Sequence, residues 1–285
     1  MNIYVDFFMK KYYLIEILIL AVILNFLTQN LINKTYIIPD NFEEKIQFRN
    51  PKVTLKTLKK TKKIAVDNQY DFARVLTINF LHNKNSLKKI TLNNKRIKTV
   101  ENIYKNANPE NYNNLLKAFS AIYNDLEYFP IVRGKNSKYW IVYEDGFYEN
   151  RNFLGSYKHE GCDIMAEYNV SGYYPIVSVT DGIVENIGWL PKGGYRVGVR
   201  GNHGGYFYYA HLSKYTNIKK GDKIKAGTLI GYMGDTGYGK EGTTGKFPVH
   251  LHFGIYIETK NYEELSINPY VILKYLEENI LYGDY

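Results

Sequence analysis

The longest apolar stretch of the chain lies close to its N-terminus. The pair Lys10-Lys11 precedes a run from Tyr12 to Leu27 that only Glu16 and Asn25 interrupt. A helix that crosses a bilayer needs about 20 mostly apolar residues. The run reaches this length when the flanking tyrosines and the apolar residues as far as Ile32 take part, and tyrosines suit the boundary between lipid and water. The pattern therefore predicts a membrane-spanning helix.

The flanking charges and the lack of a cleavage motif predict how this segment is used. No small-x-small motif follows the apolar run, so we expect an uncleaved signal anchor in place of a removed signal peptide. Lysines before the run place the N-terminus inside the cell and the remainder of the chain outside. Residues 1–33 are predicted to be a single-pass anchor in the cell membrane, with the domain after residue 130 extracytoplasmic. The alternative is a buried helix of a soluble protein.

Residues 34–65 show little apolar periodicity and are predicted to form a basic linker. They contain Pro39 and Pro51, and prolines interrupt regular structure. Six lysines lie between Lys52 and Lys63, which makes a solvated tether the simplest interpretation. Contact of these lysines with an anionic wall polymer or a lipid surface is the alternative that their charge allows.

Residues 66–130 carry apolar positions at helical spacing. Over residues 66–81 they recur at intervals of three and four, which predicts a helix. An asparagine-proline pair at 108–109 is a typical helix start, and the apolar positions of residues 112–126 mark one face of the helix that follows. Residues 86–104 indicate a short helix pair or a turn region. We expect a small helical module that acts as a spacer or a docking unit.

The pattern changes after residue 130, where short apolar segments alternate with turns that contain glycine. Such segments lie at residues 176–179, 182–187, 195–200, 206–211, 229–233 and 249–257. Short strands with turn signals every eight to twelve residues or so are typical of an all-β sandwich or a barrel-like sheet. We therefore expect residues 131–285 to form a mainly β domain. A final helix over residues 270–278 is predicted to cover one edge of the sheet.

The formal net charge of +9 is distributed unevenly. Residues 1–140 hold 23 Lys and Arg against 11 Asp and Glu, a balance of +12, whereas residues 141–285 hold 14 against 17, a balance of −3. A basic half suits an anionic wall or membrane surface, and no helix-turn-helix, zinc-finger or RNA-binding pattern accompanies it. We expect no nucleic-acid partner. The single cysteine, Cys162, excludes an intrachain disulfide.

Two histidines in the last predicted strand are separated by one residue. His250 and His252 would share one face of that strand, because side chains alternate with a period of two. His159 and Asp163 lie four residues apart, and His211 ends another predicted strand. Two histidines and a carboxylate can hold a catalytic zinc ion with its fourth position open. The two remaining histidines would serve as a base and as a partner of the oxyanion, but spacing leaves open which of His250 and His252 binds the metal.

The candidate residues fall into four motifs. They are His159-x-Gly161-x-Asp163, Tyr209-Ala-His211-Leu-Ser, Gly231-x-x-Gly234-x-Thr-Gly237 and His250-Leu-His252-Phe. In this order, and over about residues 155–272, they resemble the signature of the M23 zinc metallopeptidases, the lysostaphin-type peptidoglycan endopeptidases. The resemblance implies that Zn²⁺ is bound by His159, Asp163 and His252. It also implies that His211 and His250 are the catalytic pair, and that the domain has a two-sheet antiparallel β fold of the lysostaphin type with the metal in a groove.

By the same resemblance, the substrate is the peptide part of bacterial peptidoglycan and the chain is a zinc-dependent endopeptidase. Some members of this family have lost metal ligands and act as scaffolds in division or sporulation, whereas here every ligand is present. A non-catalytic envelope scaffold that docks a partner is the alternative function. The sequence leaves open whether a glycine bridge or a D-alanyl cross-link is cut.

Three other features are interpreted as structural. Cys162 adjoins Asp163, but neighbouring side chains of an extended segment point opposite ways, so Cys162 is expected in the core. His203 lies between glycines in a predicted turn. The glycines of residues 231–239 lack the lysine and the helix of a phosphate loop, and turns with close backbone approach explain them.

Overall fold

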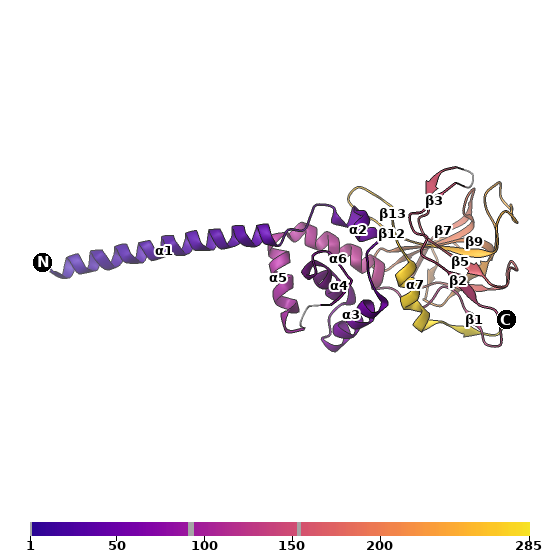
Figure 1. The fold of residues 1–285 in the computed structure, drawn as a ribbon, viewed down its shortest axis with the longest axis horizontal. Coiled ribbons are helices and arrows are strands. Elements are labelled where there is room, and N and C mark those ends of the chain that lie inside the picture. Colours follow the sequence, from indigo (N-terminus) through magenta and orange to yellow (C-terminus); the bar gives the residue numbers. More distant parts are fainter. Residues whose placement is uncertain (1, 91–93, 153–154) are drawn as a thin grey trace.

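The computed structural model describes residues 2–90, 94–152 and 155–285. A long N-terminal helix, α1 (Asn2–Thr35), projects away from the rest of the protein (Figure 1). A cluster of helices follows it, and the strands lie at the end of the molecule opposite to α1. The two termini are therefore at opposite ends of an elongated molecule.

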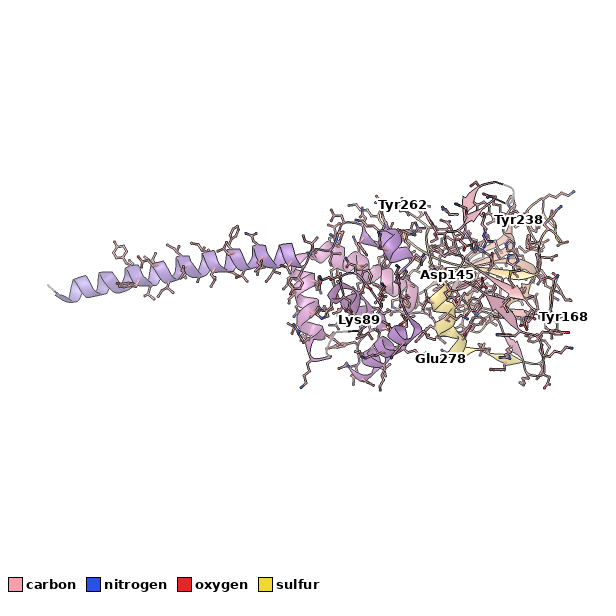
Figure 2. All side chains as sticks on the ribbon, viewed as in Figure 1. Lys89, Asp145, Tyr168, Tyr238, Tyr262 and Glu278 are labelled. Carbon is pink, nitrogen blue, oxygen red and sulfur yellow. The ribbon has the colours of Figure 1, made fainter. Side chains whose placement is uncertain are left out.

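The central part of α1 is apolar on all sides. The stretch from Lys11 to Ile32 comprises 22 residues, and none of it is buried by other segments. Figure 2 shows its side chains pointing outward with no other segment beside them. A helix of this length measures about 33 Å, which matches the hydrocarbon core of a bilayer, about 30 Å thick. The helix is thus long and apolar enough to span a membrane, and it includes the flanking residues that the prediction required.

Residues 34–65, predicted as a basic linker, contain short helical elements. The chain forms a 3-10 turn, η1 (Phe42–Glu44), and the helices α2 (Ile46–Arg49) and α3 (Leu55–Asp67). The buried side of α3 consists of Thr57, Leu58, Thr61, Ile64 and Ala65. Because threonines occupy two of these inward positions, the apolar residues alone do not show the helical period. The lysines of α3 lie on its other side and dominate the sequence pattern.

The helical module predicted for residues 66–130 is present. It contains α4 (Phe72–His82) and α6 (Pro109–Tyr123), which begins with the predicted proline. The segment between them forms a turn, η2 (Asn94–Arg96), and one further helix, α5 (Ile97–Ala107). Aromatic rings fill the centre of the module, in contacts among Phe48, Phe80, Phe119 and Tyr123.

The rest of the chain is mainly β. Its strands are β1 (Arg133–Gly134), β2 (Ile141–Tyr143), β3 (Asn150–Arg151), β4 (Tyr157–Lys158), β5 (Cys162–Ala166), β6 (Pro175–Val177), β7 (Gly182–Leu190), β8 (Gly194–Gly201), β9 (Tyr206–Tyr215), β10 (Lys223–Ile224), β11 (Leu229–Met233), β12 (His250–Ile257), β13 (Leu265–Ile267) and β14 (Tyr282–Gly283). Ten of them form one antiparallel sheet in the order β10-β7-β8-β9-β12-β5-β2, with β11 paired to β6 and β9, and β13 paired to β12. The predicted mainly β domain is confirmed.

The last helix, α7 (Tyr270–Leu276), lies between the helical module and the sheet (Figure 1). On one side it covers the terminal strand β2, where the Lys274 ammonium lies 4.1 Å from the centroid of the Tyr143 ring. On the other side Tyr275 packs against Phe72 of α4, with 6.1 Å between ring centroids. The helix thus covers a sheet edge as predicted, and one continuous hydrophobic core joins the module to the sheet.

The side chain of Arg49 ties α2 to the sheet beside a candidate site residue. Its Nε and Nη2 donate to the carbonyl (2.9 Å) and the hydroxyl (2.6 Å) of Ser266 in β13. Its guanidinium also lies over the Tyr148 ring, 4.9 Å from the centroid. The backbone N–H of Tyr148 in turn donates to the carbonyl of His159 at 2.7 Å. Because Arg49 is buried, its charge depends on these partners and on the Glu160 carboxylate, which lies 3.8 Å from Nη2.

We predict that Arg49→Met lowers the free energy of unfolding by about 2–4 kcal/mol, because Ser266 loses two buried donors. Denaturant titration of the full chain in detergent measures the change. Lys45→Met is the matched control, since Lys45 is exposed one turn earlier and its replacement should change the stability by less than about 0.5 kcal/mol. Equal stabilities of the two variants would contradict a role of Arg49 in holding α2 on the sheet.

Candidate metal centre and groove

Strand β12 brings the candidate residues together because it has a partner on each side. It pairs with β5, where His252 lies opposite Asp163, and with β9, where His252 lies opposite Ala210. Directly opposite residues of an antiparallel pair project from the same face. Asp163 and His252 therefore meet on one face, and the alternation along β12 places His250 on that face as well.

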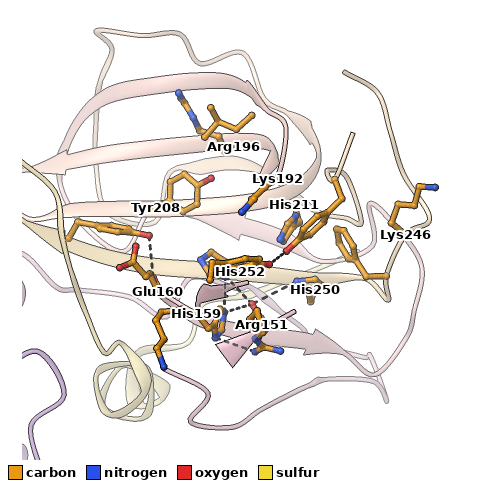
Figure 3. A pocket seen from close by; sticks show the side chains of 18 of the residues that line it. Arg151, His159, Glu160, Lys192, Arg196, Tyr208, His211, Lys246, His250 and His252 are labelled. Atoms are coloured by element: carbon orange, nitrogen blue, oxygen red, sulfur yellow. Dashed lines mark hydrogen bonds and ion pairs between the residues drawn. The ribbon is translucent and has the colours of Figure 1, made fainter. Parts of the chain in front are cut away.

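Three side-chain atoms converge at this point (Figure 3). Asp163 Oδ1 lies 3.0 Å from His159 Nε2 and 2.9 Å from His252 Nδ1, and the two nitrogens are 3.2 Å apart. Ligand atoms of a tetrahedral zinc site with bonds of 2.0–2.1 Å are about 3.3 Å apart. The three residues thus form a group that could hold a metal ion with little movement.

The hydrogen bonds of His159 direct a lone pair into this group. Its Nδ1 lies 3.0 Å from the carbonyl oxygen of Gly146, which can only accept, and 3.2 Å from Arg151 Nη2, which can donate to Asp163 instead. The shorter contact with the carbonyl assigns the proton to Nδ1 and a lone pair to Nε2. Burial would raise the pKa of Asp163, but the neighbouring His159 and His252 outweigh burial and hold the pKa well below its usual range. An imidazole lone pair and a carboxylate oxygen at 3.0 Å attract only when a cation, a proton or a metal ion, lies between them. The donor set therefore fits a divalent metal.

Arg151 supports the carboxylate and is a residue that the sequence analysis missed. Its Nη2 donates to Asp163 Oδ2 at 3.2 Å, which occupies one carboxylate oxygen and leaves Oδ1 for the converging group. Such outer partners orient metal ligands. No motif marks Arg151, because it lies in the two-residue strand β3, twelve positions before Asp163.

Gly161 leaves room for the ring of His252. A Cβ at this position would lie 2.6 Å from both Cε1 and Nε2 of His252, and 2.7 Å from the carbonyl oxygen of Phe253. Gly161 does not have a positive φ, so the close approach of the ring is the reason that a side chain is excluded here.

His211 reaches the same face through a β-bulge. In a regular strand the side chain after Ala210 would point away from His252, because successive side chains alternate. The register between β8 and β9 shifts here, and His211 adopts a φ of 62°. An extra residue of this kind turns the strand and re-aims a side chain. The backbone N–H of His211 donates to the carbonyl of Gly193 at 2.8 Å, which holds the bulge in place.

His211 and His250 lie side by side, with 4.6 Å between their ring centroids. Each Nδ1 lies 2.8 Å from a backbone carbonyl, that of Thr236 for His211 and that of Pro248 for His250. Each Nδ1 therefore carries a proton and each Nε2 a lone pair. Burial, followed by the neighbouring imidazoles, lowers the pKa of His211 to about 3, and burial also lowers the pKa of His250. His250 Nε2 lies 3.8 Å from Asp163 Oδ1, next to the converging group.

All five predicted site residues line one groove with a volume of about 680 Å³. This size is within the range of ligand-binding pockets. Aromatic side chains form much of its wall, namely Tyr157, Tyr206, Tyr208, Tyr238, Phe247 and Tyr256. Five cationic side chains line it as well, Arg151, Lys158, Lys192, Arg196 and Lys246. The groove is thus open to a ligand and richer in cations than the charge of residues 141–285 suggests.

The features interpreted as structural lie outside the converging group. Cys162 is buried, its thiol donates to the carbonyl of Glu144 at 3.4 Å, and burial raises its pKa. His203 pairs with Asp125, with 2.6 Å between Nδ1 and Oδ1, and does not line the groove. In the glycine-rich segment, a Cβ at Gly234 would lie 2.5 Å from a backbone nitrogen of β9. This segment supports the strand that carries His211.

Known proteins resemble this chain over the same region. The model of Peptidase family M23 matches residues 157–267. The L-Ala--D-Glu endopeptidase of Bacillus subtilis is 38% identical over 161 residues, which are 56% of this chain and 47% of that protein. The glycyl-glycine endopeptidase ALE-1 of Staphylococcus capitis is 40% identical over 97 residues, 33% of this chain and 24% of that protein. The chain thus spans less than half the length of these curated relatives.

The solved structure of LytM from Ruminococcus gnavus is similar over a larger part of the chain. It is 39% identical, with a TM-score of 0.74, and the match covers 85% of this chain and 94% of that one. Residues 131–285 make up 155 of 285 residues, or 54%, so a match over 85% extends into the helical module. Together with the matched family model, this likeness shows that the chain belongs to peptidase family M23.

Proposed function

We propose that this protein is a zinc-dependent endopeptidase that hydrolyses peptide bonds in bacterial peptidoglycan. The observation that carries the proposal is the convergence of His159 Nε2, Asp163 Oδ1 and His252 Nδ1, each within 3.2 Å of the others, beside His211 and His250. Membership of family M23 supports it, as do the two curated relatives, which are endopeptidases by name.

The metal would be held by His159, Asp163 and His252. Two imidazole nitrogens and one carboxylate oxygen suit zinc, and three protein ligands leave a position open for substrate chemistry. When bound, zinc supplies Lewis-acid chemistry that polarises a peptide carbonyl and makes water more acidic at neutral pH. The protein's own part is to keep the ligand nitrogens unprotonated, which the Gly146 carbonyl does for His159, and to hold Asp163 ionised.

His250 is assigned as the general base, and His211 as the residue that orients the attacking water. The Pro248 carbonyl holds the proton of His250 on Nδ1, so the lone pair of Nε2 can take a proton from water beside Asp163. His211 Nε2 also has a lone pair and can accept the second hydrogen bond of that water. His211 would donate to a developing oxyanion only after it has gained a proton, which makes water orientation its first role.

α1 is assigned as a single-pass anchor, with the N-terminus inside and the groove outside the cell. Its apolar stretch from Lys11 to Ile32 is long enough to span a bilayer, and none of it is buried by the other described residues of the protein. The lysines at its N-terminal end favour the cytoplasmic side. A peptidase in this orientation faces the cell wall, where its substrate lies.

We predict that His252→Ala and Asp163→Ala lose both stoichiometric zinc and hydrolysis, whereas His250→Ala keeps zinc and loses activity by about 10²- to 10⁴-fold, the usual contribution of a general base. Elemental analysis measures zinc, and mass spectrometry of fragments from defined peptidoglycans, with and without a chelator, measures cleavage. His203→Ala is the control histidine outside the groove and should keep both. Full hydrolysis by zinc-free protein would overturn the mechanism, and zinc without cleavage of any peptidoglycan would favour a scaffold.

Gly161→Ala should weaken zinc binding by about 10- to 100-fold, the usual cost of disturbing the support of a ligand, because the new methyl group displaces the ring of His252. Competition with a chromophoric chelator measures the zinc affinity. The adjacent Cys162→Ala serves as the control and should bind zinc as the wild type does. Loss of zinc from Cys162→Ala would instead identify the thiol as a ligand, and unchanged affinity in Gly161→Ala would contradict the role given to His252.

The anchor is tested by deleting residues 1–33. The full chain should remain with membranes after washes in high salt and alkaline carbonate, and the deleted form should be released. Protease added to intact protoplasts should degrade the groove domain while it spares a cytosolic marker. A double variant, Lys59→Gln with Lys63→Gln, should stay membrane-bound; its release would show that the lysines of α3 hold the protein on an anionic surface.

A further inference from the structure

One wall of the groove is built by the neighbouring strands β8 and β9. Arg196 of β8 and Tyr208 of β9 both line it, and Figure 3 shows Arg196 on the strand next to that of Tyr208. Tyr208 in turn packs beside His252, with 6.0 Å between ring centroids. Arg196 and the metal-binding group therefore line the same groove, where one bound substrate can contact both.

Arg196 is a cation without a partner in the part of the chain that the structure describes. Its Nη1 is buried and makes no hydrogen bond, and no carboxylate forms an ion pair with its guanidinium. Arg200, four residues further along the same strand, differs in this respect. Its Nε and Nη2 donate to the two carboxylate oxygens of Glu185 at 2.6 and 2.7 Å. A buried guanidinium nitrogen without an acceptor is costly, so its partner is expected from outside the chain.

Two tyrosines of the same wall, Tyr206 and Tyr208, supply further hydrogen-bond donors, and two glycines leave the space that their side chains occupy. A Cβ at Gly193 would lie only 2.3 Å from the Tyr208 hydroxyl, and a Cβ at Gly198 only 1.9 Å from the Tyr206 hydroxyl, so both positions require glycine. Burial raises the pKa of both tyrosines, so their hydroxyl groups are neutral donors. The two tyrosine side chains thus pack over Gly193 and Gly198, and they line the groove together with Arg196.

Other charges of the groove do not neutralise this end. Lys192 lines the groove next to Gly193 and stacks on the Tyr157 ring, with 4.0 Å from Nζ to the centroid, and it too makes no ion pair among the described residues. Of the lining carboxylates, Asp163 belongs to the converging group and Glu160 accepts a hydrogen bond from Ser266. The third, Glu264, forms no ion pair with Arg196 among the described residues, and its charge acts on Arg200, Tyr206 and Tyr208.

We infer that Arg196, with Lys192 beside it, forms a subsite for a carboxylate of the substrate peptide. A guanidinium fork binds a carboxylate through charge-assisted hydrogen bonds with defined geometry. The preferred substrate is then a peptide with a free carboxylate next to the cleaved bond, such as a γ-linked glutamate of the peptidoglycan stem. An oligoglycine bridge, which has no side-chain carboxylate, is disfavoured. This inference rests on the proposed function, because it assigns the substrate class of the same groove.

The test compares two synthetic stem peptides that differ in one group. One carries the free α-carboxylate of γ-linked D-glutamate, and the other carries the corresponding amide. We expect wild-type kcat/KM to be about 10- to 100-fold higher for the acid, as a charge-assisted hydrogen bond supplies, with most of the difference in KM. Arg196→Gln should reduce this ratio to near one, and Arg196→Lys should restore part of it. Lys223→Gln, which removes an exposed charge of β10 outside the groove, should keep the wild-type ratio.

A binding measurement separates this inference from the proposed function. Calorimetry with the His250→Ala variant reports affinity for both peptides without turnover. Tighter binding of the acid that is lost on adding Arg196→Gln supports the subsite even if the wild type cleaves neither peptide, an outcome that would overturn only the proposed function. Equal cleavage of acid and amide by the wild type, together with equal binding of the two by His250→Ala, would overturn the subsite and leave the peptidase intact. If Arg196→Gln does not fold, the ratio of wild-type kcat/KM for the acid and the amide still tests whether the groove prefers a carboxylate.

Discussion

The antiparallel pairing of β12 with β5 and β9 is the constraint on which the whole site depends. It places His252 opposite Asp163 and keeps His250 on the same face. A shift of one residue would turn both histidines to the other face of the sheet. Leu251 and Phe253 oppose such a shift, because they alternate with the histidines and are completely buried, and exposing either would cost about 1.5–3 kcal/mol. The hydrophobic core therefore holds the metal-binding geometry in register.

The strands position the imidazoles, but backbone carbonyls outside the regular strands decide which ring nitrogen is free. Gly146, Thr236 and Pro248 each accept a hydrogen bond from an Nδ1, and they do so for His159, His211 and His250 respectively. A carbonyl cannot donate, so each of these histidines presents a lone pair at Nε2. The chemistry of the groove thus depends on loops whose conformations the sheet and the glycine-rich segment support.

The helical module is part of the same folded unit as the sheet. Arg49 connects α2 to β13, and α7 packs between α4 and β2, so the hydrophobic core continues from one part into the other. The helices at residues 72–82 and 109–123 could be predicted because their apolar positions recur with a clear period and a proline marks one start. Helix α3 could not, because threonines take inward positions and lysines dominate its composition. The packing of the module on the sheet could not be predicted either, since it joins residues more than 200 positions apart.

The sequence by itself determined which residues form the centre of the site. Alternation along β12 and the four motifs named His159, Asp163, His211, His250 and His252, and all five line one groove. Only the tertiary structure decided how His211 enters it, because a bulge and a positive φ depend on the partners of β9. The same holds for Arg151 and Arg196. Arg151 contacts the carboxylate of Asp163 and Arg196 contacts none among the described residues. The packing of strands that are distant in the sequence decides this difference, so the roles of the two arginines could not be predicted from the sequence.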